Sequence, residues 1–251
     1  MLPMYRYSYT QQQAALIESA KSAATAGCMR GYGFTYSLVP AAASPSYSDR
    51  RYGLADVAEA RAYGYALPGG GSGAASVPPL TESEEVALMG NLKNPFAPVD
   101  EKVDGKQVPV GGCTMAATQL VMGAQPPTDA QQAAERISMD GFQQAAQAPA
   151  VKHAVALWQQ CMKASGYQVK SPLDIVDELK LSTVGKPGPN EVRVAVADAS
   201  CHASVRLGPV WFDAETSIEK GMISKQSALL GKLFAYHREV LLRATGIVGK
   251  R

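Results

Sequence analysis

The chain has 251 residues, of which 46% are hydrophobic and only 7% aromatic, and its formal net charge is +2. A core rich in alanine and poor in aromatic side chains favours closely packed helices over strands. The weak charge, without a cluster of basic and aromatic residues, excludes nucleic acid as an expected partner, and no apolar run is long enough to predict a transmembrane segment.

The N-terminus, MLPMYRYSYTQQQAAL, has neither the charged region nor the apolar region of a secretory signal. Two interpretations follow from this. The protein is cytosolic, or it is exported and its signal or lipid-anchor segment is absent from this sequence. Whether the cysteines form disulfides distinguishes these two interpretations.

The first part of the chain combines helices with one long loop. The loop spans 37–80, contains several prolines and the stretch GGGSG, and includes a short helical stretch that starts near Asp56. A small hairpin is expected around Asp104 and Gly105. Thr81 followed by Glu84 is a capping-box pattern. Apolar spacing predicts a helix over 11–29, and the capping box begins a short helix over 81–91. A further short helix is expected over 113–123, and the alanine- and glutamine-rich stretch 128–147 is also expected to be helical.

The second part restarts after Pro149, which breaks the chain. Helices are predicted over 151–166, 172–181 and 190–207. The longest element is a C-terminal helix over 210–247, whose apolar residues form a narrow seam of the kind that packs on another helix. The fold class is therefore all-α: a helical bundle-like body in two related halves, 1–148 and 149–251. It has a long C-terminal helix and a long loop, 37–80, that contains a short helical stretch.

A seven-residue phrase occurs twice, as CMRGYGF at 28–34 and CMKASGY at 161–167. Each copy lies at the end of a predicted helix. We expect the cysteine to anchor a disulfide, the methionine to pack, the glycine to end the helix, and the final aromatic residue to cover that end.

The four cysteines allow three disulfide pairings. Each copy of the phrase has one later cysteine in its own half, which favours Cys28 with Cys113 and Cys161 with Cys201. Disulfides imply an oxidising, extracytoplasmic setting. Three alternatives stay open: a zinc site, although no C-x-x-C pair occurs; a catalytic thiolate beside a histidine; and four free buried cysteines.

Several blocks of the sequence resemble a poorly characterised group of actinobacterial secreted or lipid-anchored proteins that carry the repeated CM-[R/K]-x-x-G-[F/Y] motif. The matching blocks are residues 28–34, 50–53, 63–68, 111–113, 158–167, 191–201 and 210–212. The resemblance implies export and a largely helical body. It implies no activity, because none is assigned to the group.

Catalytic and cofactor signatures are weak. The three histidines, His153, His202 and His237, lie on different predicted helices and belong to no HExxH motif, so no metal site is predicted. GGGSG lacks the lysine of a phosphate-binding loop. We therefore predict no catalytic residue, no metal and no cofactor.

Tyrosine and arginine gather in the long loop. Such residues dominate binding hot spots, because they combine rigid area with directed polar groups. The competing interpretation is that the rings substitute for a core and pin the loop onto helices. The candidate binding residues are Arg50, Arg51, Tyr52, Arg61, Tyr63 and Tyr65.

These observations favour a non-enzymatic, extracytoplasmic binding or scaffold protein of the cell envelope. Its partner would be a cell-envelope or membrane protein bound through the Arg50–Tyr65 loop or the terminal helix. One alternative is a metal-dependent or hydrolytic enzyme with an unrecognised site. Another is a self-assembling protein that forms a homodimer through the C-terminal helix.

Overall fold

The computed structural model describes residues 1–36, 50–67, 79–99, 102–181 and 186–249. The predicted all-α class is confirmed, because the described residues form ten helices and one small hairpin, and 68% of the structure is helical. GGGSG and most of the predicted loop 37–80 lie outside the described residues. None of the described helices combines the length and the apolarity that a bilayer span requires.

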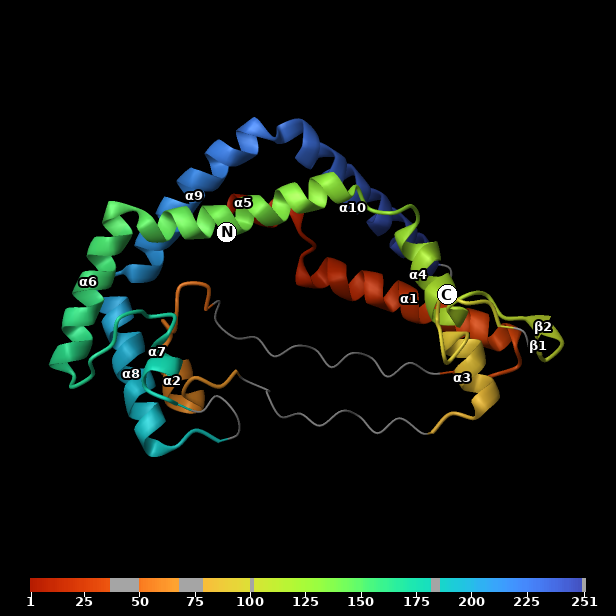
Figure 1. Cartoon of the computed structure of the whole chain (residues 1–251), viewed down its shortest axis with the longest axis horizontal. Coiled ribbons are helices and arrows are strands. Elements are labelled where there is room, and N and C mark those ends of the chain that lie inside the picture. The colour runs from red at the N-terminus through yellow and green to blue at the C-terminus, as the bar shows by residue number, and fades with distance from the viewer. Residues whose placement is uncertain (37–49, 68–78, 100–101, 182–185, 250–251) are drawn as a thin grey trace. The chain divides into compact units, whose positions relative to one another are not determined.

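The elements follow one another along the chain as shown in Figure 1. They are the 3-10 helix η1 (Pro3–Tyr7), α1 (Gln11–Gly31), α2 (Val57–Tyr63), α3 (Glu82–Met89), β1 (Lys102–Val103), β2 (Lys106–Gln107), α4 (Gly112–Met122), α5 (Thr128–Gln147), α6 (Pro149–Ala164), α7 (Ile175–Glu178), α8 (Pro189–Ser204), α9 (Leu207–Lys225) and α10 (Ser227–Val248).

Local signals in the sequence explain several of these boundaries. Thr81 and Glu84 form the predicted capping box at the start of α3. The expected hairpin is also present: β1 pairs antiparallel with β2, and both turn residues, Asp104 and Gly105, have positive φ as a type I′ turn requires.

Two predicted helices differ from those observed. The predicted terminal helix is interrupted at Gln226, whose φ of −122° and ψ of 19° lie outside the helical region. Along the predicted seam the spacing of the apolar residues widens from four positions to seven between Met222 and Leu229, and Gln226 lies in that interval. The predicted helix over 172–181 shortens to α7, because residues before Asp174 form turns instead.

The chain divides into two compact units made of interleaved segments. The described residues of unit 1 are 1–3, 50–67, 136–181 and 186–225. Those of unit 2 are 4–36, 79–99, 102–135 and 226–249. The units therefore do not coincide with the sequence halves 1–148 and 149–251.

Unit 1 is built around two buried tryptophans. Trp158 on α6 and Trp211 on α9 belong to one apolar cluster with Met162, Ile175 and Leu207. Helix α8 packs against α2, α6 and α9. Its core-facing residues include small alanines, which allow the neighbouring helices to approach closely.

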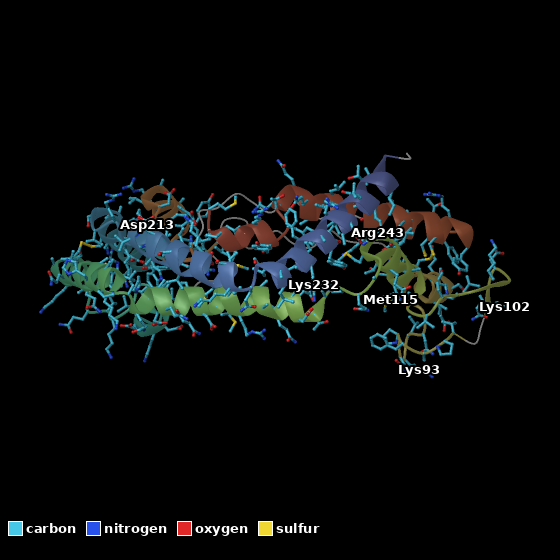
Figure 2. All side chains as sticks on the ribbon, turned by 90° about the horizontal axis from the view of Figure 1, so that it is seen from above. Lys93, Lys102, Met115, Asp213, Lys232 and Arg243 are labelled. Carbon is cyan, nitrogen blue, oxygen red and sulfur yellow. A yellow bond between two sulfur atoms is a disulfide. The ribbon has the colours of Figure 1, made fainter. Side chains whose placement is uncertain are left out.

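Unit 2 joins α10 to α1 and α4. Leu233, Tyr236, Val240 and Ala244 of the predicted seam are buried in this unit's own core. Figure 2 labels Arg243 on the same helix. Its Nε donates to the Val121 carbonyl at the end of α4, at 2.9 Å. The seam is thus covered by the chain itself, and a homodimer through this helix stays a prediction.

Candidate functional site

The first copy of the repeated phrase ends α1 with two defined hydrogen bonds. The amide of Phe34 donates to the Met29 carbonyl at 3.1 Å, and the amide of Gly33 donates to the Arg30 carbonyl at 3.0 Å. Gly33 has a φ of +82°. This arrangement is a Schellman motif, which satisfies the last carbonyls of a helix and requires a left-handed residue after it.

The second copy ends α6 in the same way. The amide of Tyr167 donates to the Met162 carbonyl at 2.9 Å, and the amide of Gly166 donates to the Lys163 carbonyl at 3.0 Å. Gly166 has a φ of +92°. Met29 and Met162, the methionines of the two copies, are both fully buried. The expected roles of methionine and glycine are therefore confirmed in both copies.

The cysteine of each copy forms the predicted disulfide. Cys28 is bonded to Cys113 of α4, with a Cα–Cα distance of 5.6 Å, and Cys161 is bonded to Cys201 of α8, at 5.7 Å. All four cysteines lie within the described residues and none is free. Sulfur atoms held in disulfides cannot ligate zinc or act as nucleophiles, so these alternatives for the cysteines are overturned.

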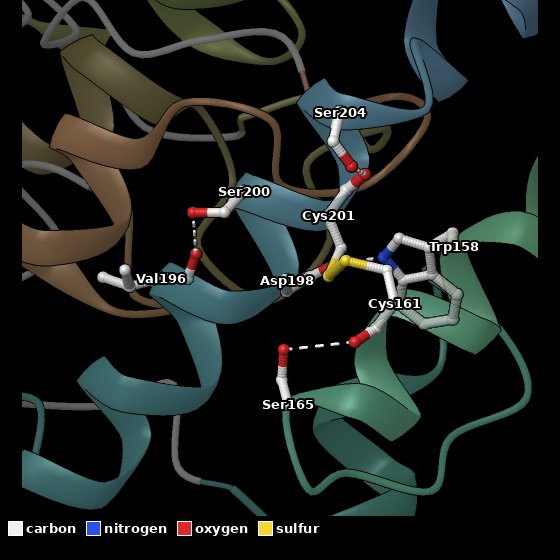
Figure 3. Close-up of a disulfide and its surroundings, with 8 residues drawn as sticks. All are labelled: Trp158, Cys161, Ser165, Val196, Asp198, Ser200, Cys201 and Ser204. Carbon is white, nitrogen blue, oxygen red and sulfur yellow. Dashed lines mark hydrogen bonds between the residues drawn. A yellow bond between two sulfur atoms is a disulfide. The ribbon is translucent and has the colours of Figure 1, made fainter.

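A hydrogen bond reinforces the second disulfide. Trp158 lies three residues before Cys161 on α6, and Asp198 lies three residues before Cys201 on α8. The indole Nε1 of Trp158 donates to Oδ1 of Asp198 at 2.9 Å (Figure 3). The two helices are thus joined twice, one turn apart.

The candidate binding residues all lie in residues 50–67, which we call the α2 segment. Arg50 closes this segment on itself. Its guanidinium forms an ion pair with Glu59 and donates to the carbonyls of Tyr65, at 2.7 Å, and Ala66, at 3.2 Å. The Arg50 side chain is only 17% exposed.

Arg51 and Tyr52 bind a buried glutamate of α9. Nε of Arg51 lies 3.0 Å from both carboxylate oxygens of Glu215, and the Tyr52 hydroxyl donates to Oε2 at 2.8 Å. Glu215 is fully buried. The Tyr52 ring stacks on Trp211 with centroids 5.5 Å apart, and burial followed by the bond to Glu215 raises the pKa of Tyr52.

Tyr65 anchors the other end of the α2 segment on α8. Its hydroxyl donates to Oδ2 of Asp198 at 3.0 Å, and its backbone amide donates to Oε1 of Glu191 at 3.1 Å. The preceding Gly64 has a φ of +57°, and a Cβ at this position would lie 2.5 Å from Glu191 Oε1. Only glycine fits this close approach of the backbone to a carboxylate.

His202 also belongs to this polar network. Its Nε2 lies 3.1 Å from the carbonyl oxygen of Tyr52. Because a carbonyl only accepts, Nε2 carries the proton. Burial lowers the pKa of His202, which keeps the ring neutral over a wider pH range.

Two of the six candidate residues are exposed and take no part in the contacts above. Arg61 is exposed, and Tyr63 is 43% exposed. Arg50, Arg51, Tyr52 and Tyr65 instead make the contacts described above. Tyr52 and Tyr65 hold the loop against helices, as the competing interpretation expects. The binding role of the six candidate residues stays a prediction.

Sequence reasoning missed the acids that hold the α2 segment. Asp198 and Glu215 are fully buried, and Glu191 is 7% exposed. A signal was present, because each of these acids lies on a helix face whose neighbours are apolar, where an acid needs a partner. The sequence does not reveal which partner meets it.

The histidines occupy different environments. His153 is exposed on α6, His202 is buried on α8, and the ring of His237 on α10 lies tilted by 39° against Tyr9, with centroids 4.2 Å apart. Among the residues that the structure describes, no group of three or more histidine, cysteine or acidic side chains is placed to hold a metal ion.

Fold and contacts define a class: an all-α protein of two compact units, each closed by one disulfide. Two disulfides are compatible with an extracellular protein and suggest an oxidising, extracytoplasmic environment. No family model, no curated protein and no solved structure matches the chain.

Proposed function

We propose that the protein is a non-enzymatic scaffold or binding protein of the actinobacterial cell envelope, exported and either secreted or lipid-anchored. The observation that carries the proposal is the repeated, disulfide-closed helix end, which occurs once in each unit. Such bonds persist where no reducing system removes them, so the proposal places the folded protein outside the cytoplasm.

The surface we assign to partner binding is the exposed side of the α2 segment. Arg61, Tyr63 and Leu67 are accessible there, and the last two are 43% and 46% exposed. The opposite side of the segment is fixed on α8 and α9 by Tyr65 and Arg51. A rigid segment loses little conformational entropy on binding, which suits a protein partner of the envelope.

Export can be tested on intact cells that produce the protein with its natural upstream region. A membrane-impermeant thiol reagent should label none of the four cysteines before reduction and all of them after an impermeant reductant. Peptide mapping of the unreduced protein should recover Cys28 linked to Cys113, and Cys161 linked to Cys201. Free thiols in the unreduced protein, or labelling that requires lysed cells, would contradict the proposed location in the cell envelope.

Binding can be tested by cross-linking in the producing cell. The double variant Arg61→Glu with Tyr63→Ala should abolish cross-links of the α2 segment to an envelope protein without changing stability, since both side chains are exposed. Arg136→Glu, at another exposed arginine of unit 1, is the matched control. Unchanged cross-links in the double variant would contradict the assigned surface. Arg50 and Arg51 are unsuitable targets, because their substitution disturbs the fold.

A further inference from the structure

Asp198 is a buried acid without a cation. It is fully buried and forms no ion pair with a described residue, whereas the buried Glu215 is paired with Arg51. Its two hydrogen-bond donors, the Trp158 indole and the Tyr65 hydroxyl, are both neutral. An ionised carboxylate in such surroundings costs far more free energy than a protonated one.

The protonated form of Asp198 can keep both contacts. Trp158 continues to donate to the carbonyl oxygen, and the Tyr65 hydroxyl, which can donate or accept, turns to accept the carboxyl proton. Ionisation therefore adds a buried charge and gains no new partner. Consistently, burial raises the pKa of Asp198 from 3.8 to about 7, and the two hydrogen bonds offset only part of the rise.

The groups around this site do not neutralise the charge. Arg50, a cation of the α2 segment, is engaged by Glu59 and two backbone carbonyls. From α6 the contact is Trp158, which does not titrate. The remaining titratable groups of the network are Tyr65 on the α2 segment, Glu191 and His202 on α8, and Glu215 on α9, which binds Arg51 and Tyr52.

Tyr65 is the residue through which the α2 segment covers Asp198. Its side chain is 8% exposed, and no covalent bond ties the segment to α8. If the Tyr65 end lifts, water reaches Asp198 and the carboxylate regains its ordinary pKa. Opening of the segment and loss of the proton are then thermodynamically linked.

We propose that the Tyr65 end of the α2 segment is a proton-controlled latch, closed on α8 while Asp198 is protonated and opened more often once Asp198 is ionised. Because the closed state binds the proton more tightly, its advantage is greatest at low pH and declines as pH rises. The equilibrium constant for opening should rise about tenfold per pH unit between the ordinary pKa of Asp198, 3.8, which applies to the open state, and its pKa of about 7 in the closed state. It should level off near pH 7.

Native-state hydrogen exchange on the full chain tests the latch. The amides to follow are those of Gly64 and Tyr65, from pH 5 to pH 8, expressed as protection factors so that intrinsic base catalysis is divided out. For the wild type we expect a loss of roughly 50-fold in protection between pH 5 and pH 7. Amides within α6 and α8 should keep their protection.

Asp198→Asn is the informative variant. Its carbonyl oxygen can accept from Trp158 and its amide can donate to the Tyr65 hydroxyl, so the contacts remain while the titrating group is lost. Protection of the α2 segment should become independent of pH. Asp213→Asn, at an exposed aspartate of α9 (Figure 2), is the matched control and should behave like the wild type.

Three results would overturn the latch. They are pH-independent protection in the wild type, the same pH dependence in Asp198→Asn as in the wild type, and a parallel loss of protection in α6 and α8. If the variant fails to fold, carbon NMR of the Asp198 carboxyl in the wild type decides. A midpoint near 7 that coincides with the loss of segment protection supports the latch, and a midpoint near 4 contradicts it.

Discussion

Gly33 and Gly166 show how single residues determine the ends of two helices. Both have positive φ, and a Cβ built on either would meet no atom within 4 Å. The need for glycine is thus conformational and not steric. The Schellman bonds around each glycine use carbonyls that would otherwise lack partners.

Gly166→Ala should lower the free energy of unfolding by about 1 kcal/mol, because alanine is strained in the left-handed region. Gly221→Ala is the control, since Gly221 lies inside α9, is exposed, and has equally open space where the alanine Cβ would stand. It should stabilise the protein by about 0.5 to 1 kcal/mol. Urea denaturation measures both changes, and equal effects would contradict the assigned motif.

The contact between Arg51 and Glu215 is the second decisive interaction at this scale. Glu215 is completely buried, while the Arg51 side chain is 23% exposed. Removing the cation would leave a buried carboxylate whose remaining donor is the neutral hydroxyl of Tyr52. An isolated buried charge is far more costly than a pair.

Arg51→Met should therefore destabilise the protein by about 3 kcal/mol. Adding Glu215→Gln should restore most of the loss, because the amide carbonyl still accepts from Tyr52 and no charge is left. The control is Arg61→Met at an exposed position, with an effect within about 0.5 kcal/mol. A double variant as unstable as the sum of its single variants would mean that the two residues do not interact.

At the scale of elements, the pairing of α6 with α8 defines unit 1. The Cys161–Cys201 disulfide and the Trp158–Asp198 hydrogen bond join the two helices one turn apart. The disulfide closes a separation of 40 residues. It restricts the unfolded chain more than it adds contacts to the folded one.

Replacing both Cys161 and Cys201 by alanine should lower the free energy of unfolding by about 2 to 4 kcal/mol. Trp158→Phe keeps the disulfide, removes the hydrogen bond to Asp198 and places a smaller ring in a fully buried site. It should cost less than the loss of the disulfide, about 1 to 2 kcal/mol. Urea denaturation without reductant compares the variants, and a larger loss for Trp158→Phe would show that the contacts of Trp158, and not the disulfide, dominate this helix pair.

The whole molecule consists of two units that the chain enters more than once. Each unit has its own apolar clusters and its own disulfide. Contacts that stabilise one unit are therefore separable from those of the other, and a local defect should be confined to its unit.

Replacing Cys28 and Cys113 by alanine should reduce hydrogen-exchange protection in α1 and α4 while leaving α6 and α8 unchanged. The reason is that this disulfide and its apolar cluster belong to unit 2 alone. Replacement of Cys161 and Cys201 should give the reciprocal pattern. Uniform loss of protection in either variant would show that the chain unfolds as one cooperative body.

Much of the secondary structure was predictable because its causes are local. The span of α5, 128–147, was predicted from its alanine- and glutamine-rich composition, and the capping box at Thr81 and the turn at Asp104 each depend on a few neighbouring residues. The interruption at Gln226 and the shortness of α7 were not predicted. The spacing of apolar residues indicates where a helix is less stable. It does not identify the residue at which the backbone leaves the helical conformation.

The sequence by itself determined the all-α class and the helix ends at the two CM phrases, and it favoured the observed disulfide partners among three possible pairings. Composition, helical period and the order of the cysteines carry that information. Only the tertiary structure decided what the α2 segment does. Arg51 meets Glu215 across 164 residues, and Tyr65 meets Asp198 across 133. A buried acid is stable only when a hydrogen-bond donor or a cation contacts it. The packing of the core decides which residue that is, and the partner can lie at any distance along the sequence.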